Sequence, residues 1–264
     1  MTHHGIPVVP TMQYILLTIA LTLVVLYIVA ATTNKSRKKW PLVRTISFTF
    51  GIFLATIAVI GPLANAAHTH FQLHMVGHLL LGMLAPLLIV FAAPMTLLLR
   101  TLPTKPARII TKFLKSPLPE FITDPITTTI LNIGGLYILY TSGLYAYMHT
   151  SSDYYMLVHA HILWAGYLFT ASILYIDPVF HRKSYRYRGI ALFAAIASHS
   201  ILAKYLYAHP PSSVPVEQAE IGSMLMYYGG GIVDGALVFL LCMHWYRATK
   251  PENTKRNTSD VLLK

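Results

Sequence analysis

The sequence contains very few cysteines and few charged residues. Its 264 residues include one cysteine, Cys242, and only 11% Asp, Glu, Lys or Arg, whereas a soluble domain usually carries about a quarter charged residues. A single cysteine excludes an internal disulfide and any metal site built from several cysteines. The shortage of charge, with 55% hydrophobic residues and a mean hydropathy of +0.56, indicates an integral membrane protein rather than a soluble one.

Long apolar runs make up most of the chain, and each is long enough for a helix of about 20 residues that crosses a bilayer. We predict an all-α fold, a seven-transmembrane-helix bundle, as one membrane domain over residues 1–246. A basic cytoplasmic tail without fixed structure is predicted at 247–264. The predicted spans cover residues 12–31, 46–64, 74–99, 126–148, 157–176, 189–207 and 221–244. Kinks are expected near Pro86 and Pro94, and residues 107–114 are expected to form a short amphipathic helix on the membrane surface.

The basic residues predict the orientation of the bundle. Of the 20 Lys and Arg, all but Lys204 fall after the first, third, fifth and seventh predicted spans. This positive-inside pattern predicts an N-terminus outside and a C-terminus inside. It also explains the net charge of +11 through topology and contact with anionic membrane lipid, so no nucleic-acid partner is expected. Basic residues follow the first span and none precedes it, the reverse of a secretory signal, so we expect an uncleaved span.

Histidines concentrate in the outer half of the predicted bundle. Of the 13 histidines, only His181 and His244 fall on the inner side. His74 and His78 are four residues apart and share one helix face, which His70 extends outward. His78, His161 and His199 bring imidazoles from three helices to a similar depth. The span that carries His161 also carries His159, which cannot share a helix face with it.

We therefore predict a metal or haem site, because polar side chains at this depth normally have a partner or a function. Imidazole suits copper, zinc, iron and nickel, and the methionines nearby favour cuprous copper. The predicted metal ligands are His74, His78, His159, His161 and His199, with His70, Met75 and Glu217 as auxiliary candidates. Structural roles are expected for His68, His149 and His209, which lie in loops or at helix ends, and for the intramembrane charges Asp234 and Lys204.

Several of these segments resemble one known family. HMVGHLLLGMLAP at 74–86, HAHILWAGYLF at 159–169 with Asp177-Pro178 after it, His199, and EQAEIGSMLMYYGG at 217–230 are similar to the Bacillus-type CtaG family. Members of that family are assembly factors of the caa-type cytochrome c oxidase, found in the bacterial cell membrane as multi-pass proteins. The resemblance covers residues 40 to 245 and implies the same histidines, His74, His78, His159, His161 and His199, as functional positions.

The resemblance implies a non-enzymatic assembly factor. Such a protein would bind copper on outer-leaflet histidines and deliver it to the copper B centre, with the catalytic copper-containing oxidase subunit as its partner. Three alternatives stay open at this point. They are a redox protein that binds haem b through paired histidines, a copper transporter, and a metal-free assembly scaffold.

Overall fold

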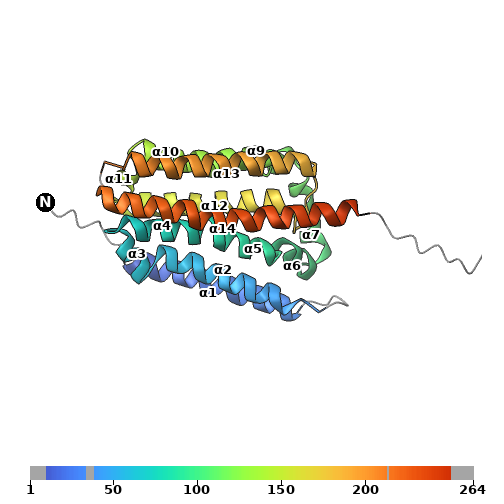
Figure 1. Cartoon of the computed structure of the whole chain (residues 1–264). Helices are drawn as coiled ribbons and strands as arrows, with labels where there is room; N and C mark the ends of the chain where they lie inside the picture. The colour runs from blue at the N-terminus through green and yellow to red at the C-terminus, as the bar shows by residue number, and fades with distance from the viewer. Residues whose placement is uncertain (1–9, 34–38, 213, 251–264) are drawn as a thin grey trace, which may run out of the picture.

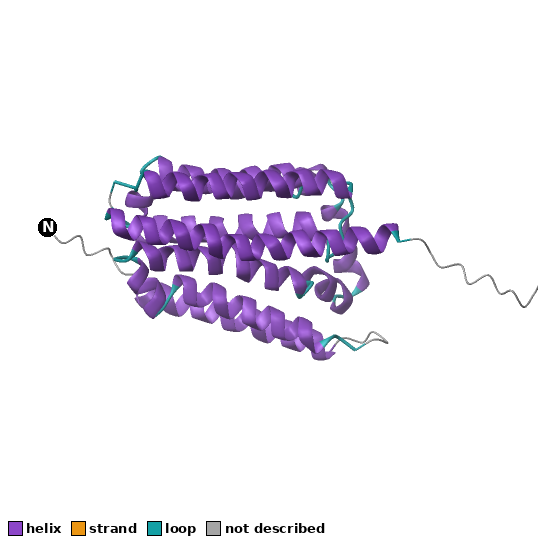
Figure 2. Cartoon of the chain, viewed as in Figure 1, coloured by secondary structure: helices purple, strands orange, loops and turns teal. Residues whose placement is uncertain are grey.

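The fold of the chain is entirely helical. The computed structural model describes residues 10–33, 39–212 and 214–250, and every regular element within those ranges is a helix. The elements are α1 Pro10–Thr33, α2 Leu42–Val59, α3 Pro62–Ala67, α4 Phe71–Leu79, η1 Leu80–Leu84, α5 Ala85–Phe91, α6 Pro94–Thr101, α7 Thr104–Leu114, α8 Pro117–Ile122, α9 Pro125–Thr129, η2 Ile130–Gly134, α10 Gly135–Thr141, α11 Leu144–Met148, α12 Ser152–Leu174, α13 Tyr185–Ala208 and α14 Val216–Thr249. The long helices run side by side, with α3 and α11 at one end of the bundle and α6 and α7 at the other (Figures 1 and 2).

Six helices of the described part are long and apolar enough to cross a membrane. They cover Thr11–Thr33, Leu42–Val59, Phe71–Phe91, Ser152–Leu174, Tyr185–Ala208 and Val216–Thr249. The predicted span 126–148 is not among them, because its helix ends at Thr141 and Ser142 and Gly143 interrupt it. The predicted span 46–64 is also too long: α2 ends at Val59, and Gly61 turns the chain at φ 88° before α3 begins. The count of seven spans therefore stays a prediction.

The helix is irregular near both prolines of the third predicted span. Proline at position 86 has no amide hydrogen, and its ring crowds the carbonyl four residues earlier. The helix accommodates this proline with a π-helical segment, η1, in which the Ala85 amide donates to the Leu80 carbonyl. Ala93 then adopts a left-handed conformation with φ 51°, and Pro94 begins the separate helix α6. The predicted span 74–99 thus ends at Phe91.

The start of α6 is held by a side chain that is distant in sequence. Asp177, which follows α12, accepts hydrogen bonds from the Met95 and Thr96 amides at 3.2 and 2.7 Å and from the Thr96 hydroxyl at 2.6 Å. A helix N-terminus has unpaired amides and a partial positive charge, so a carboxylate stabilises it. Asp177 therefore joins the end of α12 to the start of α6.

Two further predictions concern the inner side and the tail. A helix, α7, is present where the surface helix is predicted; it has no buried residue and exposes Ile109 and Phe113. Its position on the membrane surface stays a prediction. The tail was predicted to begin at residue 247, but α14 continues to Thr249 because its backbone hydrogen bonding persists to that point. The remainder of the predicted tail, residues 251–264, lies outside the described residues.

Glycines let α12 approach η1 closely. A Cβ placed on Gly166 would strike the Gly82 carbonyl oxygen and lie 3.2 Å from the Pro86 ring. The Gly82 carbonyl is the one that Pro86 leaves without its usual helical amide partner. Close approach at this point brings α12 against the segment that follows His78.

Replacing Gly166 with Ala is expected to destabilise the protein by about 1–3 kcal/mol, because the added methyl group forces α12 away from η1. Gly189→Ala is the matched control, since a Cβ there meets nothing within 4 Å and Ala is favoured over Gly in a helix by about 0.5–1 kcal/mol. Thermal unfolding in detergent would measure both changes. Equal stabilities of the two variants would contradict the close packing of α12 on η1.

Candidate functional site

Three helices bring four buried histidines together in the described part of the bundle. His74 and His78 lie one turn apart on α4, His159 lies on α12 and His199 on α13, and all four are at least 92% buried. This burial confirms that they face the interior, as their spacing predicts. They divide into a group near the α3–α11 end and a deeper pair.

The outer group combines imidazole and tyrosine rings. The His74 ring centroid lies 6.3 Å from those of both His159 and His149. The Nε2 atom of His74 lies 3.0 Å from the Tyr140 hydroxyl oxygen. The Nδ1 of His159 lies 2.8 Å from the Tyr155 carbonyl oxygen, which can only accept, so this nitrogen carries the proton and donates it. The Nε2 atom of His159 then keeps its lone pair, the form in which an imidazole can bind a metal.

The deeper pair is His78 and His199, whose ring centroids are 6.1 Å apart. Both ring nitrogens of His78 and the Nε2 atom of His199 are buried without a hydrogen-bond partner. Most buried polar atoms in proteins have such a partner, so these three nitrogens are unusual. The Nδ1 of His199 faces Asp234 of α14, whose Oδ2 atom is 4.0 Å away.

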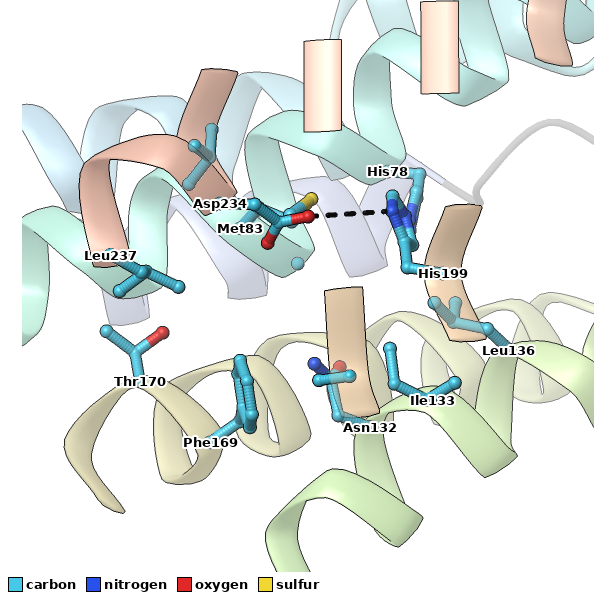
Figure 3. A pocket seen from close by; sticks show the side chains of 13 residues that line it. His78, Met83, Asn132, Ile133, Leu136, Phe169, Thr170, His199, Asp234 and Leu237 are labelled. Carbon is cyan, nitrogen blue, oxygen red and sulfur yellow. Dashed lines mark ion pairs between the residues drawn. The ribbon is translucent and has the colours of Figure 1, made fainter. Parts of the chain in front are cut away.

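The deeper pair lines a small cavity between helices (Figure 3). In the close-up, the side chains of His78, His199 and Asp234 point toward one another. The cavity volume is about 20 Å³, enough for about one water molecule or an ion of similar size. Six of the lining residues are polar or carry a lone pair that can bind an ion: His78, Met83, Asn132, Thr170, His199 and Asp234. The cavity is thus a polar site inside an apolar bundle.

Both π-helical segments contribute to this cavity. Gly82 and Met83 belong to η1, and Asn132 and Ile133 belong to η2. A π-helical turn inserts an extra residue and redirects the side chains that follow it, and such turns are frequent at functional sites. Here each of the two turns places residues of its own in the wall of the site.

Glycine 230 lets α14 approach His199. A Cβ at Gly230 would lie 2.5 Å from the His199 Cε1 atom and 3.1 Å from its Nδ1 atom. The ring therefore rests against bare backbone, and the same helix carries Asp234 one turn later. This contact sets the position of the His199 ring relative to the carboxylate.

The structure does not bring His161 into either group. The His161 side chain is exposed, and its Nε2 atom lies 3.2 Å from the Leu131 carbonyl oxygen of η2. It packs on Gly135, where a Cβ would lie 2.5 Å from the same nitrogen. The prediction that His159 and His161 cannot share a face holds, and His159 is the residue that faces inward.

The auxiliary candidates are also outside the deeper site. His70 and Glu217 are exposed, and the Nδ1 atom of His70 lies 2.8 Å from the Thr69 hydroxyl. The sulfur of Met75 is fully buried but accepts a hydrogen bond from the Tyr140 hydroxyl at 3.7 Å. Met83, which was not a candidate, is the thioether that lines the cavity.

Three residues for which the sequence predicts only a structural role belong to these groups. They are Asp234 at the cavity and His68 and His149 at the outer end. Asp234 carried one usable signal, a carboxylate flanked by glycines within an apolar span, which is rare without a function. His68 and His149 lie in loops and carried no such signal.

The donor set of the deeper pair suits a soft or borderline metal ion. A histidine that binds metal usually donates its second ring N–H to a carboxylate, and the Asp234 carboxylate lies 4.0 Å from the Nδ1 atom of His199. Thioether and imidazole are ligands that copper accepts. Within the described ranges, no three His, Cys, Asp or Glu side chains come together as a metal site. His78 and His199 are the two imidazoles at this cavity that could hold an ion, with Asp234 and Met83 beside them.

The outer loop histidines are neutral at ordinary pH. Burial and, secondarily, the neighbouring His68 imidazole lower the pKa of His149 to about 4. Burial also lowers the pKa of His68 from its usual value of 6.5. The outer end therefore presents uncharged imidazoles.

Comparison with known proteins gives one family and several distant relatives. The sequence model of the cytochrome c oxidase caa3 assembly factor family (Caa3_CtaG) matches residues 25–248. An uncharacterized protein of Mycobacterium leprae is 27% identical over 174 residues, which is 63% of this chain and 26% of that protein. An uncharacterized protein of Mycobacterium bovis is 29% identical over 180 residues, 64% of this chain and 27% of that protein. The chain thus spans about a quarter of the length of these relatives, and no solved structure matches it.

The metal-free protein is expected to lose stability as the pH falls from about 7 toward 4. His149 takes up a proton near its usual pKa when unfolded but only near 4 when folded, so acid favours the unfolded chain. His149→Phe should therefore flatten the decrease in melting temperature between pH 7 and pH 5. Thermal unfolding in detergent would measure it, with the exposed His209→Phe as the matched control. An unchanged pH dependence in His149→Phe would contradict the buried, neutral state of this imidazole.

Proposed function

Because this chain belongs to the cytochrome c oxidase caa3 assembly factor family, we propose that it carries copper to the oxidase. In this proposal the protein is a seven-span protein of the bacterial plasma membrane, with its N-terminus outside and its C-terminus inside. It receives copper from the outer side, holds it on buried histidines and passes it to the copper B centre of the catalytic oxidase subunit. Copper is the cargo, and no bond of a substrate is made or broken apart from exchange of ligands.

One observation carries this proposal: the unpartnered nitrogens of His78 and His199 at the buried cavity. Leaving a buried polar group without a partner costs about 1–3 kcal/mol, so a protein retains such groups where they have a use. Two imidazoles with a carboxylate behind one of them form a site of low coordination number. A site of this kind keeps open positions, which a receiving protein needs in order to take the ion.

The size of the cavity favours an ion over a larger cofactor. Its volume of about 20 Å³ is far below the roughly 300–1,000 Å³ of sites for larger organic ligands. Haem b on His78 and His199 would require the helices to separate. A copper importer would need polar groups along the inner halves of the spans, and Asp234 already belongs to the deeper site.

His78→Ala and His199→Ala are each expected to remove copper binding at the deeper pair, because each deletes one of its two imidazoles. His161→Ala is the matched control, since its imidazole is exposed and hydrogen-bonded to Leu131. Copper per chain after loading and detergent purification would be measured together with a visible spectrum. In cells, the same variants should lower the copper content of the oxidase.

Three results would count against this proposal. Normal oxidase copper in His78→Ala and His199→Ala cells, with normal protein levels, would leave a metal-free scaffold as the function. A Soret band in the purified protein would indicate a haem protein. Loss of copper in His161→Ala alone would move the site to the outer surface of α12.

Asp234→Asn is expected to weaken copper binding by about 10–100-fold, the usual effect of removing a carboxylate that supports a metal-binding histidine. The amide keeps the size of the carboxylate, so the cavity should stay intact. Competition with a copper chelator of known affinity would measure the change, with the exposed Asp153→Asn as control. Equal affinities of the two variants would mean that Asp234 has no part in holding copper.

A further inference from the structure

A second pair of histidines meets at the outer end of the bundle. His68 follows α3 and His149 follows α11, and both helices lie at the same end (Figure 1). Their Nδ1 atoms are 3.1 Å apart, although the residues are 81 positions apart in the chain. Both Nε2 atoms are buried without a hydrogen-bond partner. The two rings are therefore brought together by the fold and are not otherwise anchored through their second nitrogens.

The geometry of this pair suits a bound metal ion. Two imidazole nitrogens that bind one tetrahedral ion at about 2.0–2.1 Å are separated by about 3.3 Å, close to the 3.1 Å between these Nδ1 atoms. We propose that His68 and His149 form a second copper site, separate from the deeper pair. Copper is held at this outer site first. The role of first site rests on the function proposed above, whereas binding of the metal by the two rings does not.

A series of imidazoles connects this site to the deeper pair. The His149 ring lies 6.3 Å from that of His74, and the His74 ring lies 6.3 Å from that of His159. His74 and His78 are successive on one face of α4, and His78 lies 6.1 Å from His199. The imidazoles therefore form a continuous series from the outer pair toward the deeper pair.

The surroundings of the outer pair are compatible with a cation. The His68 ring lies 5.0 Å from that of Tyr155, and the His149 ring lies 5.0 Å from that of Tyr145. Aromatic faces attract cations. No lysine or arginine occurs between residues 45 and 99 or between 116 and 181, so the segments that carry both histidines contain no competing positive side chain.

The test is a comparison of copper stoichiometry in the full-length protein. Wild type, His68→Asn/His149→Asn and His78→Ala/His199→Ala would be loaded with cuprous ion from a weak chelator, purified in detergent and assayed for copper per chain. His209→Asn, an exposed histidine that stacks on Tyr205, is the matched control. The single variants His68→Asn and His149→Asn are tested as well, in case the double variant does not fold.

The expected result is two coppers in wild type and one in each double variant, with slower filling of the deeper pair in His68→Asn/His149→Asn. Wild-type stoichiometry and loading rate in the His68 and His149 variants would overturn the inference and leave a hydrogen-bonded pair of rings. The proposed function fails separately. One copper per chain in both wild type and His78→Ala/His199→Ala would mean that the deeper pair binds none, and would leave the outer site standing alone.

Discussion

The apolar interior of the bundle imposes the constraint on which the rest of the structure depends. Hydrocarbon offers no hydrogen-bond partners, so each polar group inside must be satisfied by the protein itself. Most of the buried polar side chains follow this rule. The Thr128 and Ser172 hydroxyls pair at 2.8 Å, and the Tyr27 hydroxyl donates to the Ala92 carbonyl at 2.7 Å. The unpaired nitrogens of His78 and His199 are among the exceptions.

Irregular backbone is concentrated where it shapes the cavity. The two π-helical segments, η1 and η2, each present residues to the site, and both interrupt helices that would otherwise be regular. Asp177 fixes the chain just after α5 by capping the start of α6. Close glycine contacts at Gly166 and Gly230 bring α12 and α14 inward. The same departures from regular helix geometry therefore shape both the fold and the site.

Much of this arrangement follows from local sequence patterns. Apolar length predicts the helices, and the four-residue spacing of His74 and His78 predicts their shared buried face. The sequence also shows that only one of His159 and His161 can face inward. Which one does so depends on how α12 packs against η1 and η2, and that depends on Gly82, Gly135 and Gly166. No local pattern contains this information.

Other features depend on contacts between distant segments. His68 and His149 meet because α3 and α11 end at the same side of the bundle, which spacing alone does not reveal. Asp234 approaches His199 because α14 packs along α13 with Gly230 between them. α14 also begins at Val216, five residues before the predicted span at 221. Tertiary packing decides these positions, and a single sequence does not show which distant residues will meet.

The shortage of oxygen donors at the cavity has a consequence for selectivity. Calcium requires about six to eight oxygen ligands and magnesium a near-octahedral set of oxygens, whereas the wall of this cavity contains Asp234 as its single carboxylate. A hard cation that entered would find too few oxygen ligands to replace its hydration shell in full. The donors of this cavity therefore suit calcium and magnesium poorly.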